Sequence, residues 1–216
     1  MTLRERRLRE QAQRHRLILT TAREMAEAEG WDHVTTRRLA DRIEYSQPVL
    51  YQHFKNKDAL VHAVALEGFA ELAAALRAAR LGTADPRGAL DAVARAYVDF
   101  AERGPVLYQA MLTLDPGGDD TPDGTPAGTA EGTAEGACGG ARGDTPAALA
   151  DVLDEIGLAV APVAAGRDGE LLAEVLWSAW HGLAVLTGGR RLRPGLTGRR
   201  LAALTEVLLG PAAQPA

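Results

Sequence analysis

Residues 35–60 read TTRRLADRIEYSQPVLYQHFKNKDAL, and the order of polar and apolar side chains in this stretch predicts two short helices joined by a turn. Thr35 is a typical N-cap, so the first helix is expected over residues 36–43. A two-residue turn follows, and Ser46 is placed to cap the second helix. Two helices in this order are the sequence form of a helix-turn-helix.

The second helix of this pair divides into a buried side and an outward side. At about 100° per residue, Leu50 and Phe54 share one side and are expected to be buried. Pro48 and Gln52 then point almost opposite, away from the core. In a helix docked into the major groove, outward residues of the first turns meet base edges and flanking polar residues meet phosphates. The helix therefore has the pattern of a DNA-recognition helix.

The side chains around this outward face suit double-stranded DNA. Glutamine can pair with base edges, apolar side chains contact thymine methyls, and hydroxyl, imidazole and cationic groups donate to phosphates. The predicted base-contacting residues are Gln47, Pro48, Val49 and Gln52. The other predicted DNA-contacting residues are Thr35, Thr36, Arg37, Ser46, Tyr51, His53, Lys55 and Lys57. For any one of them an ordinary solvated polar side chain is the alternative, but together they form a specific pattern.

The charge of the chain is divided unevenly. The net charge is −5, yet residues 1–63 carry 12 Lys and Arg against 9 Asp and Glu, a net of +3. The remaining 153 residues carry 12 against 20, a net of −8. This asymmetry indicates a polyanion partner for the first part only. The arginine-rich start provides either minor-groove or phosphate contacts or a solvated charged tail, and it comprises Arg4, Arg6, Arg7, Arg9, Arg14 and Arg16.

The rest of the chain also has the residue pattern of helices. The predicted helices cover about residues 14–29, 36–43, 47–54, 57–81, 87–103, 105–114, 146–165, 168–188 and 196–209. No convincing strand occurs, so we expect an all-α fold of about nine helices. Residues 1–64 are the expected DNA-binding domain, with three helices, and residues 65–216 are the expected larger helical domain for ligand binding and dimerisation.

Residues 115–146 differ in composition from the rest. They contain a repeated GTAEG and almost no large apolar side chain. Such a segment cannot bury enough surface to offset the entropy lost on ordering. We expect a disordered loop whose deletion leaves folding and DNA binding intact.

Other classes of protein find little support in the sequence. No HExxH, GxSxG, phosphate loop or metal-spaced Cys and His cluster occurs, so neither an enzyme nor a cofactor or metal is expected. The single Cys138 excludes an intramolecular disulfide framework and fits the cytoplasm. No apolar run approaches the ~20 residues of a membrane-spanning helix, and the charged start lacks the apolar segment of a signal peptide. A helical protein-interaction module is the remaining alternative.

Residues 17–64 resemble the DNA-binding domain of the TetR family of bacterial transcriptional regulators. The family signature LYxHFxxKxAL is present as Leu50, Tyr51, His53, Phe54, Lys57, Ala59 and Leu60. The resemblance implies a homodimer whose two helix-turn-helix units read a palindromic operator. It also implies phosphate contacts from Tyr51, His53 and Lys57, and a helical carboxy-terminal domain that binds a small molecule and releases DNA.

One position departs from the family pattern. The family usually has glycine in the turn where this sequence has Glu44. A non-glycine residue in a left-handed conformation costs roughly 1 kcal/mol. Either the turn has another shape here or the chain accepts this cost.

The carboxy-terminal half carries a shorter resemblance. Trp180, His181 and Gly182 resemble the Trp-His-Gly subgroup of TetR carboxy-terminal domains. The family resemblance places helices 168–188 and 196–209 in a four-helix dimer interface. The candidate residues for a largely apolar small-molecule effector are Tyr97, Phe100, Tyr108, Met111, Trp177 and His181. Packing in the core or the dimer interface is the leading alternative for all of them.

Overall fold

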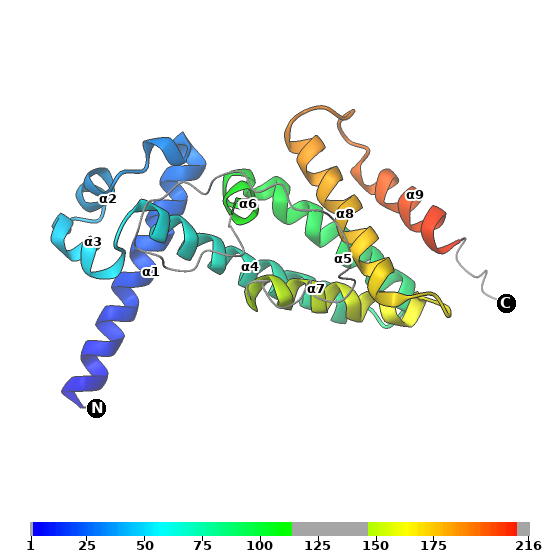
Figure 1. The fold of residues 1–216 in the computed structure, drawn as a ribbon, viewed down its shortest axis with the longest axis horizontal. Helices are drawn as coiled ribbons and strands as arrows, with labels where there is room; N and C mark the ends of the chain where they lie inside the picture. The colour runs from blue at the N-terminus through cyan, green and yellow to red at the C-terminus, as the bar shows by residue number, and fades with distance from the viewer. Residues whose placement is uncertain (1, 114–146, 211–216) are drawn as a thin grey trace, which may run out of the picture.

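The computed structural model describes residues 2–113 and 147–210, so the predicted loop at 115–146 lies outside the described residues. The described ranges hold nine α-helices and no strand, which confirms the all-α prediction (Figure 1). The helices are α1 (Leu3–Glu29), α2 (Thr36–Arg42), α3 (Gln47–His53), α4 (Lys57–Leu81), α5 (Pro86–Arg103), α6 (Pro105–Leu112), α7 (Ala147–Val160), α8 (Gly169–Gly188) and α9 (Thr197–Leu209). Short 3-10 turns, η1 (Trp31–His33) and η2 (Ala161–Val163), follow α1 and α7.

Helix α4 connects the two ends of the molecule (Figure 1). The Asn56 side chain accepts a hydrogen bond from the Ala59 amide (2.8 Å) and so caps the start of the helix, as the sequence predicts. α4 packs against α1 and, further along, against α5, α6 and α7. Leu60 and Val64 near its start and Leu72 and Leu76 near its end belong to one continuous core. Both halves of the chain therefore share one helix.

Helices α4 and α8 are long and apolar enough to cross a membrane by length and composition alone. α4 packs against α1, α5, α6 and α7, and α8 packs against α5 and α7. Contacts of this kind are typical of core helices in a helical bundle. The absence of a membrane partner stays a prediction.

Two local predictions are wrong. α1 begins at Leu3 rather than near residue 14, because Thr2 and Glu5 form a capping box. The Thr2 hydroxyl accepts from the Glu5 amide (3.3 Å), and the Glu5 carboxylate accepts from the Thr2 amide (3.0 Å). At α3, Ser46 precedes the helix but makes no capping hydrogen bond with its side chain.

The turn between α2 and α3 has the geometry that the family pattern implies. Glu44 has a φ of 59°, in the left-handed region where glycine is usual. The next residue, Tyr45, donates its amide to the Ala40 carbonyl at 3.0 Å, which closes the turn onto α2. The chain thus keeps the turn and accepts a strain of about 1 kcal/mol at Glu44.

Gly68 determines how closely α4 approaches α6. A Cβ atom at this position would lie 2.8 Å from the sulfur of Met111 and 3.0 Å from Cδ1 of Leu107. Both side chains are fully buried and have little room to move. Only glycine therefore allows the present separation of the two helices.

We expect Gly68→Ala to destabilise the protein by about 1–3 kcal/mol, because the added methyl group overpacks the α4–α6 contact. Gly157→Ala on α7 is the matched control, since a Cβ there meets nothing within 4 Å. A glycine inside a helix costs roughly 0.5–1 kcal/mol relative to alanine, so the control should gain stability. Urea unfolding measures both changes. Equal stability of the two variants would contradict the packing argument.

Candidate nucleic-acid interface

An ion pair between Arg38 of α2 and Glu29 of α1 connects the helix-turn-helix to the end of α1. The Arg38 guanidinium donates to both carboxylate oxygens of Glu29 (2.8 and 3.0 Å) and to the carbonyl of His33 (2.9 Å). The hydrogen bonds to Arg38 lower the pKa of Glu29. Exposed ion pairs add little stability, but a bidentate one restricts orientation. This contact sets the direction of α2, where Thr35 accepts from the Arg38 amide (3.2 Å) as predicted.

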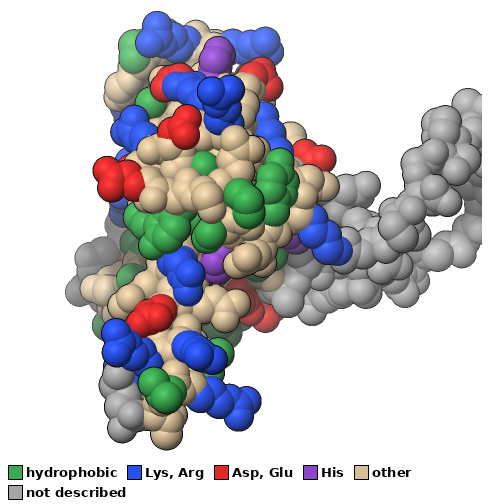
Figure 2. Space-filling view, turned by 90° about the vertical axis from the view of Figure 1, so that its left-hand side faces the viewer, with side chains coloured by type: hydrophobic (Ala, Val, Ile, Leu, Met, Phe, Trp, Pro, Cys, Tyr) green, Lys and Arg blue, Asp and Glu red, His purple; other side chains and the backbone are tan. Residues whose placement is uncertain are grey.

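Helix α3 is two-sided, as the sequence predicts. Leu50 and Phe54 are buried, whereas Gln47, Pro48 and Gln52 are exposed. Figure 2 shows this end of the molecule, with hydrophobic side chains near the middle and Lys and Arg side chains above and below them. The exposed side of α3 is therefore available to a partner, and cations lie on the same end of the molecule.

Tyr51 and His53 each have neighbours from other helices. The Tyr51 side chain is 52% exposed, and its hydroxyl lies 3.4 Å from Oγ1 of Thr36 on α2. The half-buried His53 ring lies 5.8 Å from the ring of His15 on α1. Burial, followed by the charges of His15 and Arg14, lowers the pKa of His53. In the free protein the imidazole is therefore neutral at pH 7.

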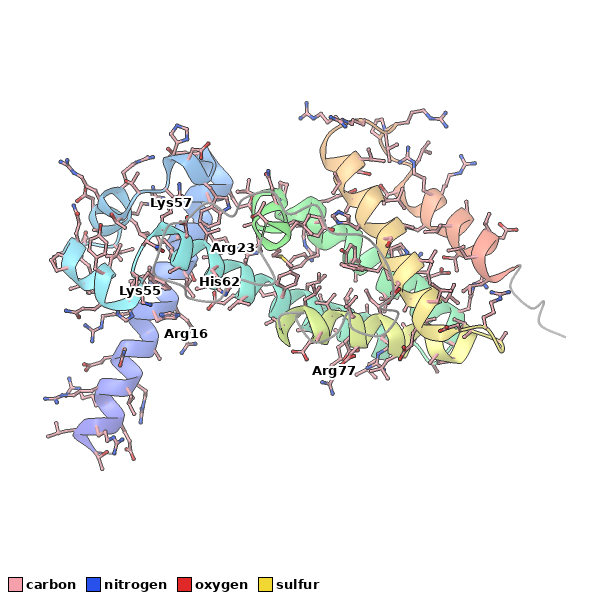
Figure 3. The ribbon with its side chains drawn as sticks, viewed as in Figure 1. Arg16, Arg23, Lys55, Lys57, His62 and Arg77 are labelled. Atoms are coloured by element: carbon pink, nitrogen blue, oxygen red, sulfur yellow. The ribbon has the colours of Figure 1, made fainter. Side chains whose placement is uncertain are left out.

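The remaining predicted contacts surround α3. Thr35, Arg37, Ser46 and Lys55 are exposed, whereas Val49 and Lys57 are half-buried. Lys55 and Lys57 lie at the junction between α3 and α4 (Figure 3). All twelve residues predicted from the sequence thus lie on or beside α2, α3 and the start of α4.

Sequence reasoning missed the connection between α1 and α6. The Leu107 amide donates to Oε1 of Glu27 (2.9 Å), and the Val106 amide donates to Oε2 (3.4 Å). The Trp31 indole donates to the Val106 carbonyl (3.3 Å). The first amides of a helix have no intrahelical acceptor, so a carboxylate from α1 satisfies two of them. Pro105 indicates that a helix starts there, but no residue near it in the sequence indicates that Glu27 accepts hydrogen bonds from the first amides of that helix.

Four of the six candidate effector residues form a hydrogen-bonded chain, in which Tyr97 and Tyr108 are buried and the ends, Trp177 and His181, are half-buried. The Trp177 indole nitrogen lies 3.0 Å from the Tyr97 hydroxyl, which lies 2.9 Å from the Tyr108 hydroxyl. The Tyr108 hydroxyl lies 2.8 Å from Nδ1 of His181. Burial raises the pKa of both tyrosines and lowers the pKa of His181, so all four groups are neutral near pH 7.

The direction of the protons in this chain follows from the chemistry of its ends. An indole nitrogen only donates, so Trp177 donates to Tyr97. Every group is satisfied when Tyr97 donates to Tyr108 and Tyr108 donates to an unprotonated Nδ1 of His181. A protonated His181 would have to donate instead, which leaves one tyrosine proton without an acceptor.

The other two candidate residues pack in the same core. Phe100 and Met111 are buried, and Met111 faces Gly68 of α4. Trp180 is also fully buried, with its ring 6.1 Å from that of Tyr97, and its indole N–H has no hydrogen-bond partner in the described part of the chain. In residues 2–113 and 147–210, no three His, Cys, Asp or Glu side chains are grouped to hold a metal ion.

Comparison with known proteins identifies the class of this protein. Residues 18–64 match the family model of bacterial regulatory proteins of the tetR family, and residues 90–210 match that of the tetracyclin repressor-like C-terminal domain. The chain belongs to the TetR family. TetR-family proteins are DNA-binding transcriptional regulators, so family and fold are not those of an enzyme. The Trp-His-Gly subgroup stays a prediction.

Individual relatives of this TetR-family chain are similar over different lengths. The class C tetracycline repressor protein of Escherichia coli is 50% identical over 48 residues, which is only 22% of either chain. An uncharacterized HTH-type transcriptional regulator of Mycobacterium tuberculosis, Rv0681, is 29% identical over 78% of this chain and 67% of its own. A solved protein of unknown function from Rhodococcus sp. RHA1 has a TM-score of 0.70 at 26% identity, over 93% of this chain and 95% of its own.

The half-buried His181 makes the stability of the protein sensitive to acid. Because burial lowers the pKa of His181 in the folded state, the unfolded state takes up a proton first as the pH falls through 6.5. The free energy of unfolding should therefore fall below that pH, and His181→Gln should remove part of this dependence. His62→Gln, at an exposed position on α4, is the control and should keep it. Urea unfolding at pH values from about 5 to 8 compares the variants. An unchanged pH dependence in His181→Gln would contradict the assignment.

Proposed function

We propose that this regulator is a dimeric repressor that a small, largely apolar effector releases from a palindromic operator. The single observation that carries the proposal is the two-sided α3, with Leu50 and Phe54 buried and Gln47, Pro48 and Gln52 exposed. A helix held in this way can enter the major groove without disturbing its own core.

The contacts to DNA divide into two kinds. Gln47, Pro48, Val49 and Gln52 read base edges: Pro48 and Gln52 lie on the outward side of α3, Gln47 is exposed in its first turn, and Val49 lies half-buried on the flank. The phosphate contacts come from Thr36, Arg37, Tyr51, His53, Lys55 and Lys57, with Thr35 and Ser46 beside them. The contact between Tyr51 and Thr36 supports this division, since it holds two hydroxyl groups side by side across α2 and α3.

A second copy of the chain covers α8 and α9. Large apolar side chains on these helices are exposed, with Leu171 at 57% and Val207 at 82%, and Val175, Val185 and Leu186 continue the exposed set on α8. Exposed apolar groups of this number on two neighbouring helices are typical of an interface (Figure 1). Dimerisation through α8 and α9 gives the two α3 helices that a palindrome needs.

The effector occupies the core between α5, α6 and α8. Polar groups come from the hydrogen-bonded chain of Trp177, Tyr97, Tyr108 and His181 and from the indole N–H of Trp180, which has no partner in the described part of the protein. Phe100 and Met111 supply apolar surface beside them. Tyr108 lies next to Leu107, whose amide binds Glu27 of α1. A shift of α6 therefore moves the end of α1 and changes the spacing of the recognition helices. The cytoplasm is the proposed site of action.

The division of contacts is tested with two variants. Gln47→Ala should lose about 1–3 kcal/mol on the operator and little on a scrambled duplex, because a base-edge contact carries sequence information. Lys57→Ala should weaken binding to both duplexes. It should also reduce the magnitude of the slope of log K against log salt by about 0.9 per subunit, because one phosphate contact is lost. The operator probe is a duplex enriched from a random pool by the wild-type protein.

Matched controls lie far from α3. Gln109→Ala removes an exposed glutamine from α6, and Arg77→Ala removes an exposed cation further along α4 (Figure 3). Neither should change affinity or salt slope. An equal loss of Gln47→Ala on both duplexes would reject the base contact. A monomeric wild-type protein without preference for any enriched duplex would reject the proposed function.

A further inference from the structure

The first turns of α1 extend beyond the helix-turn-helix as a helical arm, which we define as residues 3–16. Its residues are exposed apart from the half-buried Arg14 and His15, and the first buried residue of α1 is Ile18. The arm projects away from the other helices at the lower left of Figure 1. The capping box at Thr2 and Glu5 closes its free end, so the arm is a defined helix.

The arm has an inner and an outer side. Ile18, Ala22 and Met25 are buried on one side of α1. At about 100° per residue, the same side of the helix continues through Arg14 toward the start of the arm, and we call it the inner side. The inner side carries Arg4, Arg7, Gln11 and Arg14, and the outer side carries Arg6 and Arg9. Arg16 lies at the edge between the two sides, beside His53. The inner arginines thus occupy positions that would be buried if the core extended further.

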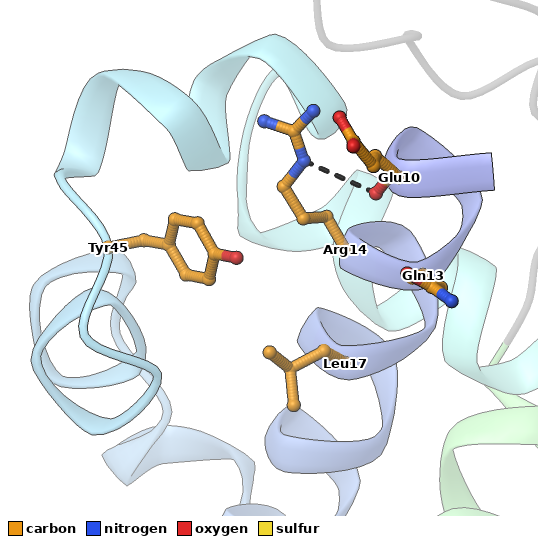
Figure 4. Close-up of a pocket in the computed structure, with 5 residues that line it drawn as sticks. All are labelled: Glu10, Gln13, Arg14, Leu17 and Tyr45. Atoms are coloured by element: carbon orange, nitrogen blue, oxygen red, sulfur yellow. Dashed lines mark hydrogen bonds between the residues drawn. The ribbon is translucent and has the colours of Figure 1, made fainter. Parts of the chain in front are cut away.

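Two hollows show that the inner side stands clear of α3. One, of about 460 Å³, lies between the arm and Tyr45, and Arg14 and Tyr45 line it from opposite sides (Figure 4). The other, of about 360 Å³, lies between the arm and His53 and is lined by Leu8 and His15 among others. The two hollows thus separate the arm from the α2–α3 turn on one flank and from the end of α3 on the other.

The charge of the arm fits a polyanion. The arm holds six arginines and two glutamates, a net of +4. Both carboxylates already have partners: Glu5 binds Thr2, and Glu10 pairs with Arg6 at 2.9 Å. Arg4 and Arg7 have no hydrogen-bond or ion-pair partner within residues 2–113 and 147–210. Their guanidinium groups are suited to phosphate oxygens.

We propose that the inner side of the arm binds the phosphate backbone of DNA beside the half-site that α3 reads. The inference rests on the proposed function, since it needs DNA docked on α3. From Arg4 to Arg14 the helix rises about 15 Å, a length along the DNA axis over which one strand presents four or five phosphates at ~3.4 Å each. The Tyr45 hydroxyl and Arg14 complete the strip next to α3.

Two double variants with the same change of charge test the proposal. Arg4→Ala with Arg7→Ala removes two inner contacts and should lower the slope of log K against log salt by about 1.8 per subunit, on enriched and scrambled duplexes alike. Arg6→Ala with Arg9→Ala removes two outer arginines, neither of which lines a hollow, and should change the slope by less than half of that. Circular dichroism of each variant checks that the helix content is retained.

The outcomes separate this inference from the proposed function. If the wild-type protein prefers its enriched duplex but the inner and outer pairs lose affinity equally, the arm acts only as diffuse charge and the inference is wrong. If neither double variant loses affinity for DNA, the arm is a solvated charged helix and the inference is also wrong. If the wild-type protein shows no preference for any duplex, the proposed function fails and the inference with it. A larger loss of slope for the inner pair supports the arm contact.

Discussion

The structure depends on α4, a helix of 25 residues that belongs to two packed regions at once. Its start packs with α1 beside the helix-turn-helix, and the rest of its length packs with α5, α6 and α7. Because interiors are close-packed, a helix shared in this way cannot shift at one end without a response at the other. The absence of a side chain at Gly68 adds to this constraint, since α6 lies against α4 with no spare space. The recognition helix is therefore mechanically continuous with the carboxy-terminal core.

A second, polar connection runs beside α4. Glu27 and Trp31, at the end of α1 and in η1, hold the first turn of α6 through its amides and a carbonyl. A carboxylate bound to two amides at a helix start has a narrow range of good geometries. The two connections differ in kind: α4 transmits displacement, and the Glu27 contact restricts the orientation of α6. Both end close to Tyr108, on the same short helix.

The sequence predicts those features of the fold that depend on local periodicity and helix capping. The faces of α3, the cap at Asn56 and the all-α class follow from residues within one or two turns of each other. The helical arm could not be predicted in this way, because its polar sequence has no apolar period and its start depends on one capping box. Long-range partners were also out of reach: Glu27 and Leu107 are 80 positions apart, and Tyr108 and His181 are 73 apart. Residue type shows that such groups need partners, but only the fold shows which ones.

The hydrogen-bonded chain of Trp177, Tyr97, Tyr108 and His181 has a consequence for the chemistry of the proposed effector. Trp177 can only donate, so with an unprotonated Nδ1 on His181 the hydroxyl protons run from Trp177 toward His181. Because Trp177 only donates, a ligand group that replaces His181 as the partner of Tyr108 must present an acceptor. A group of the wrong polarity leaves a buried hydroxyl unsatisfied, at about 1–3 kcal/mol. An effector bound in this core, as proposed above, would be selected by the position of its hydrogen-bond acceptor as well as by its size and shape.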